Sequence, residues 1–434
     1  MITEECDVLV IGGGPAGSTA ATLLAESGRQ VVLLEKSAHP RFHVGESLLP
    51  RNLAQLDRLG VTAQVAAIGV YKPGAEFVDE ATGGRTQFPF SLALNPQFTH
   101  SYQVRRAEFD EILFRNAAAR GAEAHENTRV TGVALDPAGL RHTVTAVGAD
   151  GAEHTVRPRF ILDATGRDTL LATQLGAKES NRRNSTAAVY AHFHGAVPKL
   201  GEEDGFITIH LADDGWFWFI PLPDEVMSVG FVGNASAWKA RRGTAEAFLE
   251  ARIAQSPLVS ARLRGAERIS GVTMTGNYSY AARRAHGPGY MMIGDAFAFL
   301  DPVFSSGVLL AMTAGEMGAD VAAAGLRNPA AGEAAARRAE RQMRTAMRTL
   351  SWLVYRINRP VLRAMFMAPS NRFRMRDGLV AMLAGNLRLD WRMRAPVLAF
   401  KGAYYMLTAA YRLGYRLPPT SAPVEVPAAT PVAA

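Results

Sequence analysis

Lysine is scarce in this sequence, and one lysine stands where an amine could do chemistry. Of the 47 basic residues, 41 are arginines and six are lysines. Lys72 lies in the short run Tyr71–Ala75, YKPGA. An amine can hydrogen-bond a reactive electrophile or form a covalent adduct with it, and a guanidinium is less suited to that role. By itself, Lys72 could equally be a solvated loop residue.

Two tryptophans are spaced so that they would lie on the same face of a strand. Trp216 and Trp218 alternate within Gly215–Pro221, GWFWFIP. On a β-strand, alternate side chains point to the same face, so both rings would lie together. Aromatic packing in the core is the alternative interpretation.

A third candidate site could bind an anion. Ser306 and Gly307 precede Val308–Ala324, an apolar run rich in small residues that predicts a helix. Backbone N–H groups at the start of a helix can hold an anion. An ordinary helix N-cap is the alternative. Glu316 and Asp320 within the run argue against a membrane span.

The segment Cys6–Glu35 predicts a nucleotide site that would position these groups. The sequence predicts a buried parallel strand over Val8–Ile11, a helix over Ser18–Leu24 and a second strand over Val31–Leu34. Glu35 follows the second strand, where its carboxylate could accept a hydrogen bond from a ribose hydroxyl. A G-x-G-x-x-G motif between strand and helix allows a tight turn, close approach to a pyrophosphate and helix packing; it spans Gly12, Gly14, Pro15, Ala16 and Gly17. A plain glycine turn is the alternative.

The composition is that of a globular protein and excludes two kinds of cysteine-based site. The chain has 434 residues, 48% hydrophobic and 20% charged, which is typical of a globular protein with two or three structural units. The single cysteine, Cys6, excludes a disulfide framework and a multi-cysteine metal site, and we expect no metal. Residues 1–5 leave no room for a signal peptide before the first strand, so we expect a cytoplasmic protein.

Positive charge is concentrated towards the C-terminus. Residues 337–416 hold 17 Lys and Arg against three acidic residues, whereas the residues before 337 sum to −6. We expect an acidic protein partner rather than a membrane surface or nucleic acid, since no nucleic-acid module accompanies the charge. A solvated helical face is the alternative. Ala395–Leu413 reads as an amphipathic helix.

Three further motifs resemble the FAD-dependent monooxygenase-type superfamily. They are Asp163–Gly166 after a buried strand, Gly294–Ala296 before the long helix, and Arg106–Asp110 at a helix start. In that superfamily the aspartate of G-D-A meets the ribityl-phosphate region, and the following helix aims its N-terminus at the flavin. Together with the glycine motif, this resemblance covers about residues 1–330.

Four stretches resemble the flavin-dependent halogenases more specifically. Pro40–Ser47 looks like their P-R-x-H-V-G-E-S loop, Gly215–Pro221 like G-W-x-W-x-I-P, and Asp301–Val308 like D-P-x-F-S-S-G-V. Lys72 falls where the family places its catalytic lysine. The resemblance is closest to the branch that acts on pyrrole or phenol groups tethered to a carrier protein.

This resemblance implies an α/β fold with a Rossmann-type FAD-binding domain, an inserted antiparallel β-sheet substrate domain and a C-terminal α-helical segment. The expected FAD-binding parts are 1–70, 101–180 and 277–330; the β-rich substrate domain comprises 71–100 and 181–276; helices occupy 331–417, and a disordered tail 418–434.

The implied reaction uses FADH₂, O₂ and chloride or bromide to halogenate an electron-rich aromatic or conjugated substrate. A separate reductase would supply reduced flavin, because no second nucleotide motif is present, and an acidic acyl or peptidyl carrier protein could present the substrate. The catalytic residues implied are Lys72, Trp216 and Trp218, and the halide ligands Ser306 and Gly307. The implied cofactor residues are Gly12, Gly14, Pro15, Ala16, Gly17, Glu35, Lys36, His43, Gly45, Glu46, Ser47, Arg106, Asp163, Gly166, Gly294, Asp295, Pro302, Gly307 and Val308.

One departure and two alternatives bear on the substrate. Tryptophan halogenases carry a glutamate directly before S-T-G, where this chain has Phe304. The change favours electron-rich phenols or pyrroles over free tryptophan. A flavin monooxygenase or geranylgeranyl-reductase-like oxidoreductase is the alternative enzyme, and a membrane-peripheral flavin-binding protein the alternative class.

Overall fold

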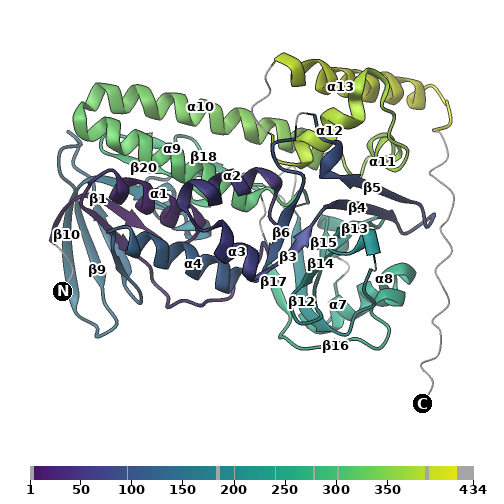
Figure 1. Ribbon diagram of the computed structural model, residues 1–434, viewed down its shortest axis with the longest axis horizontal. Coiled ribbons are helices and arrows are strands. Elements are labelled where there is room, and N and C mark those ends of the chain that lie inside the picture. Colours follow the sequence, from purple (N-terminus) through teal and green to yellow (C-terminus); the bar gives the residue numbers. More distant parts are fainter. Residues whose placement is uncertain are drawn as a thin grey trace.

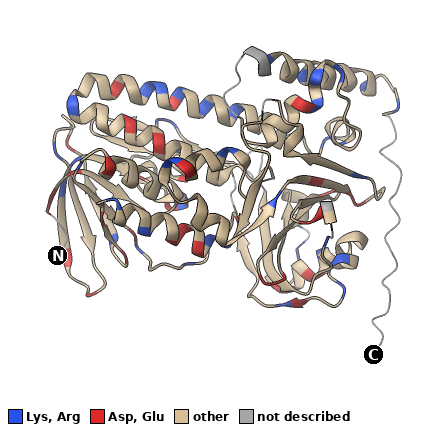
Figure 2. Cartoon of the chain, viewed as in Figure 1, with Lys and Arg blue, Asp and Glu red and all other residues tan. Residues whose placement is uncertain are grey.

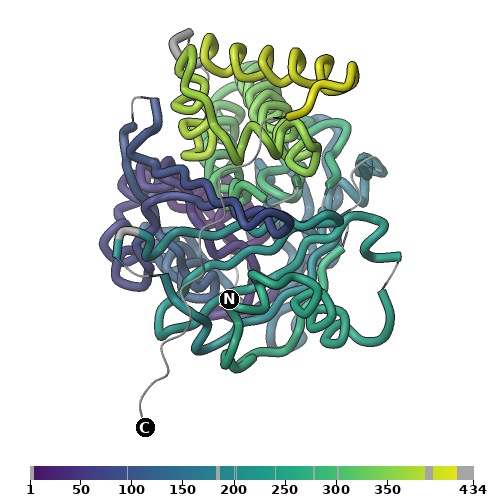
Figure 3. The backbone as a smooth tube through the Cα atoms, turned by 90° about the vertical axis from the view of Figure 1, so that its right-hand side faces the viewer, coloured from purple at the N-terminus to yellow at the C-terminus, as the bar shows by residue number. Residues whose placement is uncertain are grey.

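The computed structural model describes residues 4–94, 96–181, 186–199, 201–239, 241–276, 279–300, 303–386 and 391–417. Two large sheets lie side by side, with helices over their faces (Figure 1). Figure 3 shows the C-terminal helices as a separate layer above the second sheet. Asp301, Pro302 and the predicted disordered tail lie outside the described residues.

The first sheet is mostly parallel and carries the N-terminal glycine motif. Its order is β19-β20-β10-β1-β2-β7, and only the edge strand β19 is antiparallel to its neighbour along this path. β9 extends it by pairing with the start of β10, and β8 pairs with β9. The strands are β1 Glu5–Ile11, β2 Val31–Leu34, β7 Glu123–His125, β8 Arg129–Ala134, β9 Thr143–Val147, β10 Glu153–Asp163, β19 His286–Gly287 and β20 Tyr290–Met292.

Helices bury this sheet, which explains why its central strands are almost wholly apolar. α1 packs on α4, and α9 packs on both α1 and α10. The helices around this part are α1 Pro15–Glu26, α2 Pro50–Leu59, α3 Thr62–Ala67, α4 Arg106–Ala119, α5 Leu170–Gln174, α9 Gly307–Arg327 and α10 Pro329–Val354. Within the described ranges, α9 alone has the length and composition of a membrane span, and half of that stretch is buried in the fold.

The second sheet joins two segments that are far apart in the sequence. Its order is β16-β12-β15-β14-β13-β4-β5, with β17 also paired to β12. β4 runs parallel to β13, and the other pairs are antiparallel. The strands are β4 Gly74–Asp79, β5 Arg85–Pro89, β12 Ala187–His194, β13 Ile207–Leu211, β14 Gly215–Leu222, β15 Val226–Gly233, β16 Glu267–Arg268 and β17 Thr273–Thr275.

Each face of the second sheet has its own core. Phe217, Phe219 and Phe231 form one core with the helices α6 Ala235–Lys239, α7 Ala245–Ala254 and α8 Pro257–Arg262. Trp216 and Trp218 lie in the other core, with the C-terminal helices α11 Pro360–Met367, α12 Met375–Leu383 and α13 Trp391–Arg412. Alternation along β14 therefore decides which aromatic side chain enters which core.

Two small sheets link the larger parts. β3 Gly69–Lys72 pairs with β6 Ser101–Val104, and β11 Lys178–Ser180 pairs with β18 Tyr280–Ala282, which pairs with β21 Ala298–Phe299. The first of them carries Lys72 at the end of β3.

Two boundaries differ from the sequence expectations for physical reasons. The first helix begins at Pro15 rather than Ser18, because proline is pre-organised for the first helical position. The strand expected over Phe160–Asp163 begins at Glu153, and its first half alternates between exposed and buried residues where it pairs with β9.

Candidate active site

The glycine motif forms a tight loop at the start of α1. Gly12 has φ +106°, and a Cβ there would lie 2.3 Å from the Ala164 carbonyl oxygen. A Cβ on Gly17 would lie 1.9 Å from the Gly12 oxygen, so Gly17 allows α1 to pack on the loop. Gly14 is the N-cap of α1, and a Cβ there would approach only the Arg41 guanidinium, at 3.6 Å. The N-terminus of α1 is therefore open to an anion such as a diphosphate.

Glu35 organises this loop from the end of β2. Its carboxylate is buried and accepts from the backbone N–H of Gly13 at 2.8 Å and of Ser37 at 3.0 Å. Oε2 also meets Arg41 Nη2 at 3.5 Å, and Oε1 retains a lone pair for a further donor. Glu35 thus combines a structural role with an acceptor site at the edge of a cavity.

One continuous cavity of about 440 Å³ runs from this loop to the second sheet. Gly12, Gly14, Pro15, Ala16, Glu35 and Lys36 line it beside the glycine loop. Ile207, Ile209, Trp216, Trp218, Ile220 and Val303 line it beside the second sheet. The two sheets therefore share one site, polar where phosphates would bind and apolar where a ring would lie.

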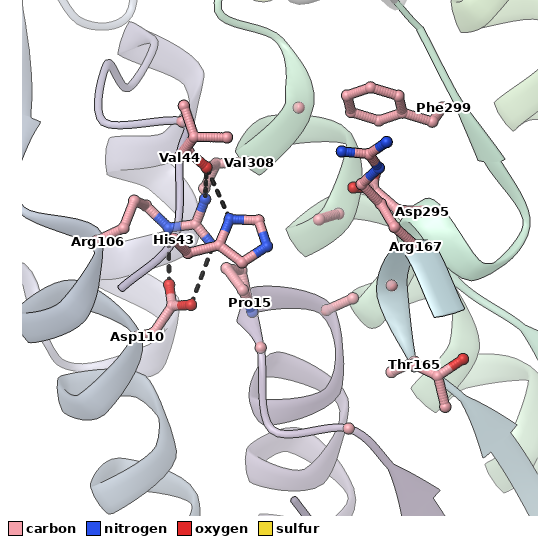
Figure 4. Close-up of a pocket in the computed structure, with 18 of the residues that line it drawn as sticks. Pro15, His43, Val44, Arg106, Asp110, Thr165, Arg167, Asp295, Phe299 and Val308 are labelled. Atoms are coloured by element: carbon pink, nitrogen blue, oxygen red, sulfur yellow. Dashed lines mark hydrogen bonds and ion pairs between the residues drawn. The ribbon is translucent and has the colours of Figure 1, made fainter. Parts of the chain in front are cut away.

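Arg106 is held in place on one side of the cavity. Its Nε and Nη2 donate to the two carboxylate oxygens of Asp110 at 2.8 and 3.0 Å, and its Nη1 donates to the Val44 carbonyl at 2.8 Å (Figure 4). Burial opposes ionisation of Asp110, but Arg106 and Arg41 outweigh it and lower the Asp110 pKa. Gly45, with φ +109°, lets the loop pass close to Arg106.

His43 shares this side of the cavity. Its Nδ1 lies 2.8 Å from the Val44 carbonyl. Burial, and then the charge of Arg106, lowers the His43 pKa to about 4. The ring is therefore neutral at physiological pH, with Nδ1–H as the donor to Val44.

Glu46 and Ser47 continue the loop towards the second sheet. Glu46 is buried, and its Oε1 lies 2.7 Å from Nε2 of His192 on β12. Both Glu46 and Ser47 line the cavity. This contact ties the loop that carries His43 to the second sheet.

Asp295 and Arg167 face the cavity from the side opposite His43 (Figure 4). Arg167 lies over the Phe299 ring, with 5.6 Å between Cζ and the ring centroid. Burial raises the pKa of Asp295 to about 6, although Arg106 and Arg167 both act to lower it. Asp295 is therefore the acid here whose ionisation the fold disfavours.

We expect Asp295→Asn to stabilise the chain above pH 6. The folded pKa of about 6 exceeds the ordinary 3.8, so ionisation destabilises the fold, with the cost growing from pH 3.8 to 6 and constant above. The asparagine variant should gain about 3 kcal/mol of unfolding free energy at pH 8. Urea denaturation without cofactor measures it; a gain that is equal at pH 4 and pH 8 would contradict this electrostatic origin.

Trp216 and Trp218 form part of the chamber wall. Both are buried, their ring centroids lie 6.0 Å apart, and the Trp218 indole donates to Ser228 Oγ at 3.1 Å. The prediction that the two rings share one face is confirmed, since both belong to the same core and line the same cavity.

Lys72 is buried away from the lining of this cavity. Its Nζ donates to the Leu48 carbonyl at 2.8 Å and lies 5.3 Å from the centroid of the Phe90 ring. Burial lowers its pKa to about 7. The amine is thus neither a solvated loop group nor in direct contact with the cavity.

The start of α9 meets the cavity beside Val303. Ser305, Gly307 and Val308 line the cavity, and a Cβ on Gly307 would meet nothing within 4 Å. Ser306 is the buried N-cap residue and does not line it. Of the two predicted halide ligands, Gly307 is therefore placed at the cavity, and the neighbouring Ser305 takes the position expected of Ser306.

Some predicted cofactor residues shape the site without lining it. Asp163 is buried, and its burial raises its pKa. Its carboxylate accepts from the backbone N–H groups of Thr165 and Leu171 and thereby fixes the turn after β10. Gly17 and Gly294 are not among the residues that line the cavity. The remaining described cofactor residues face the cavity, among them His43, Gly45, Glu46, Ser47, Arg106, Gly166 and Val308.

The sequence argument missed Arg41, Arg167 and Phe42, which all line the cavity. Arg41 contacts Asp110 at 3.3 Å and Glu35 at 3.5 Å, and its buried Nε has no hydrogen-bond partner among the described residues. Its place in the Pro40–Ser47 motif was a signal that could have identified it. A half-buried guanidinium at the start of α1 suits a diphosphate.

The residues present fit FAD. Gly14 leaves room for a diphosphate at the N-terminus of α1, beside the Arg41 guanidinium, whose Nε has no hydrogen-bond partner in the described part of the chain. Glu35 offers an acceptor where a ribose would lie, and the cavity continues as an apolar, aromatic chamber that suits a ring system. Among the described residues, no cluster of His, Cys, Asp and Glu could hold a metal ion.

Comparison with known proteins agrees with this site. Residues 5–336 match the family described as FAD binding domain. The chain is 38% identical to tryptophan 2-halogenase from Chondromyces crocatus over 340 residues, which cover 76% of this chain and 63% of that relative. It is 31% identical to flavin-dependent halogenase armH2 from Armillaria mellea over 376 residues, 81% of this chain and 72% of that relative. The chain thus spans under two thirds of the first relative's length.

Solved structures share the fold along nearly the whole chain. A flavoprotein/dehydrogenase from Cytophaga hutchinsonii superposes with a TM-score of 0.84 at 29% identity, covering 95% of this chain and all of that one. The flavin-dependent brominase Bmp2 superposes with a TM-score of 0.79 at 26% identity and the same coverage. With an FAD-shaped site and these relatives, the chain belongs to the flavin-dependent halogenase family and carries its FAD-binding domain.

Proposed function

We propose that this protein is an FADH₂-dependent halogenase that uses O₂ and chloride or bromide to halogenate an electron-rich aromatic or conjugated substrate. The observation that carries the proposal is the single cavity that joins the glycine loop to the chamber beside Trp216 and Trp218. Reduced FAD with O₂ would supply the oxidant that converts halide into an electrophilic halogen. Overall, two electrons from FADH₂ and two from the substrate C–H bond reduce O₂ to two waters as the carbon–halogen bond forms.

Residues of this chain would bind the cofactor and the halide and enclose the reaction chamber. Gly14, Arg41 and Glu35 would hold the diphosphate and ribose of the cofactor. The N-terminus of α9, at Ser305 and Gly307, offers backbone donors to a halide. The two tryptophans line the chamber beside the second sheet, where we expect them to favour transfer of the halogen over direct hydroxylation.

Lys72 is proposed to receive the electrophilic halogen, by a hydrogen bond or as a haloamine. With its pKa lowered to about 7, an appreciable fraction of the amine is neutral at physiological pH and able to act as a nucleophile. Because Nζ is bonded to the Leu48 carbonyl, the side chain must release that bond to meet a halogen.

The chamber supports an electron-rich ring as substrate. Phe304 packs against Phe77 and Phe366 and does not line the cavity, so no carboxylate is offered at that position. A ring that is already electron-rich needs less help to lose its proton. Tryptophan 2-halogenase is the name of a relative, and free tryptophan is therefore a necessary comparison substrate.

Turnover with a flavin reductase and bromide tests the proposal. Products from simple phenols, pyrroles and tryptophan are analysed by mass spectrometry, with a scavenger present for free hypohalite. We expect the paired isotope pattern of bromine on a phenol or pyrrole. A product heavier by one oxygen would instead indicate a monooxygenase, and a product heavier by two hydrogens a reductase, which the flavoprotein/dehydrogenase neighbour makes the second candidate.

A carrier-tethered substrate is a further part of the proposal. Arg372 and Arg374 lie in the turn before α12 and Arg376 in the first turn of that helix, and Arg374 and Arg376 each contact Asp377 at 3.4 Å. An acidic carrier protein could bind this turn by charge.

Charge reversal tests the docking of a carrier. Arg372→Glu with Arg374→Glu and Arg376→Glu should raise the apparent KM for a carrier-bound substrate roughly tenfold, with kcat and the KM for the free acid unchanged. The matched control reverses three exposed arginines of α10, Arg337, Arg338 and Arg341. An unchanged KM, or an equal rise in the control, would remove the carrier from the proposal.

A further inference from the structure

The helix α13 has two apolar faces, and within the described part of the chain only one of them packs against the rest of the fold. Val397, Phe400 and Tyr404 are buried in the core shared with the second sheet. Trp352 at the end of α10 anchors this face: its ring packs against Tyr404, and its indole donates to the Tyr405 hydroxyl at 3.0 Å. The helix is therefore held in a fixed orientation.

The opposite face of α13 is apolar and exposed. Leu398 is 65% exposed, Met406 70% and Leu413 81%. Their spacing places them on one side of the helix, together with Gly402 and Ala409, because positions three, four, seven and eight apart share a face. Leu413 belongs to this face because its backbone N–H still bonds the Ala409 carbonyl at 3.1 Å. The face runs for about 22 Å.

Among the described residues of α13 and the turn after it, every charged side chain beside this apolar face is positive. By their helix positions, Arg394, Lys401 and Arg412 flank it on one side, with Lys401 Nζ 5.1 Å from the centroid of the Trp352 ring, and residues 391–417 contain no acidic side chain. Figure 2 shows blue but no red on the coloured part of α13. Tyr405 is 53% exposed beside the apolar residues, a position that tyrosine favours at a membrane–water interface. Apolar side chains bordered by cations and tyrosine are the pattern of a helix that lies in an anionic lipid surface.

We propose that the exposed face of α13 docks this protein on an anionic membrane surface, a property independent of the proposed halogenation. A second copy of the chain is a poorer occupant, since it would bring the same positive charges together without acidic partners. An acidic carrier protein is also poorer, because ten consecutive residues between Lys401 and Arg412 carry no charge for it to pair with. Lipid suits both features at once: acyl chains meet the apolar residues, and anionic headgroups meet the cations.

Vesicle flotation of the FAD-loaded full chain tests the proposal. The probes are vesicles of phosphatidylcholine alone and of phosphatidylcholine with an equal amount of phosphatidylglycerol. We expect binding to the anionic vesicles, weak binding to the neutral ones, and marked loss of binding at about 1 M NaCl, where the Debye length is about 3 Å. Leu398→Ser with Met406→Ser and Leu413→Ser should weaken binding at least about tenfold.

A matched control substitutes three exposed apolar residues outside the C-terminal helices: Leu140→Ser, Val197→Ser and Ile269→Ser. It should bind vesicles as the wild type does, and bound FAD, read from its absorbance, should be equal in all three proteins. No binding of the wild type to anionic vesicles, or equal loss in both variants, would overturn the proposal. If the wild type does not bind vesicles but self-associates, and the α13 variant loses that self-association, the face binds a second copy of the chain. If the wild type does not bind vesicles but captures an acidic carrier protein, the face binds that partner.

Discussion

Halogenation by Lys72→Met should fall by roughly 10²–10⁴-fold while FAD binding is retained. The amine would be lost, but the methionine fills similar volume and Lys72 does not line the cavity. The measurement is bromide incorporation into an electron-rich phenol, with a flavin reductase and a hypohalite scavenger. Lys178→Met is the control, because that amine lies over the Tyr280 ring and bonds Thr169, outside the cavity.

The stability of the same variant separates catalysis from structure. Burial lowers the folded pKa of Lys72 from 10.5 to about 7, so the buried ammonium destabilises the fold at low pH. The unfolded chain binds more protons between pH 7 and 10.5, and wild-type stability from this group therefore rises across that window. Lys72→Met should accordingly be more stable than the wild type at pH 6, with the difference shrinking towards pH 9, as measured by urea denaturation.

These two results together decide the role of Lys72. A variant that is stable, binds FAD and does not halogenate identifies the amine as a catalytic group kept at a cost to stability. Full halogenation in the variant would assign Lys72 to holding the Leu48 segment against β3, through the bond from Nζ to the Leu48 carbonyl. Lost FAD binding would also remove the catalytic interpretation.

Gly14→Val should raise the dissociation constant for FAD at least about 100-fold, equivalent to about 2.7 kcal/mol. The backbone of Gly14 has φ −77°, which any residue adopts, and a Cβ there would approach only the flexible end of Arg41. The cofactor-free fold can therefore accept the side chain. A branched side chain at the N-cap of α1 would instead occupy the space that a diphosphate needs.

Cofactor titration by flavin fluorescence and thermal unfolding without FAD measure the two effects of Gly14→Val. The unfolding temperature without FAD should stay near that of the wild type. Gly28→Ala is the control for a glycine outside the cavity: it has φ +77°, and a Cβ there would meet nothing within 4 Å, so it should cost some stability and leave FAD affinity unchanged. Wild-type affinity in Gly14→Val would show that the cofactor phosphates bind elsewhere.

The local parts of this site could be predicted from the sequence. The glycine loop, the strand before it and Glu35 after β2 all lie within one short segment, so their spacing alone places an acceptor and an open helix N-terminus at the same strand ends. The common face of Trp216 and Trp218 likewise follows from the two-residue period of a strand.

Contacts between distant segments were decided only by the tertiary structure. The parallel pairing of β4 with β13 joins residues far apart in the chain, and no local pattern specifies that register. The same holds for the contact between Glu46 and His192 and for the burial of Lys72 against Leu48. Motif spacing predicted the residue types near the cofactor, but not that Ser305 rather than Ser306 would face the cavity.

What the sequence by itself determined is the class of site: a dinucleotide-type loop, an aromatic strand and a scarce lysine, each defined by neighbours within a few residues. The tertiary structure decided which side chains come into contact, that the amine of Lys72 is buried away from solvent, and which face of α13 stays exposed. The physical reason is that backbone periodicity acts over a few residues, whereas burial and its effect on pKa depend on every segment that packs around a group.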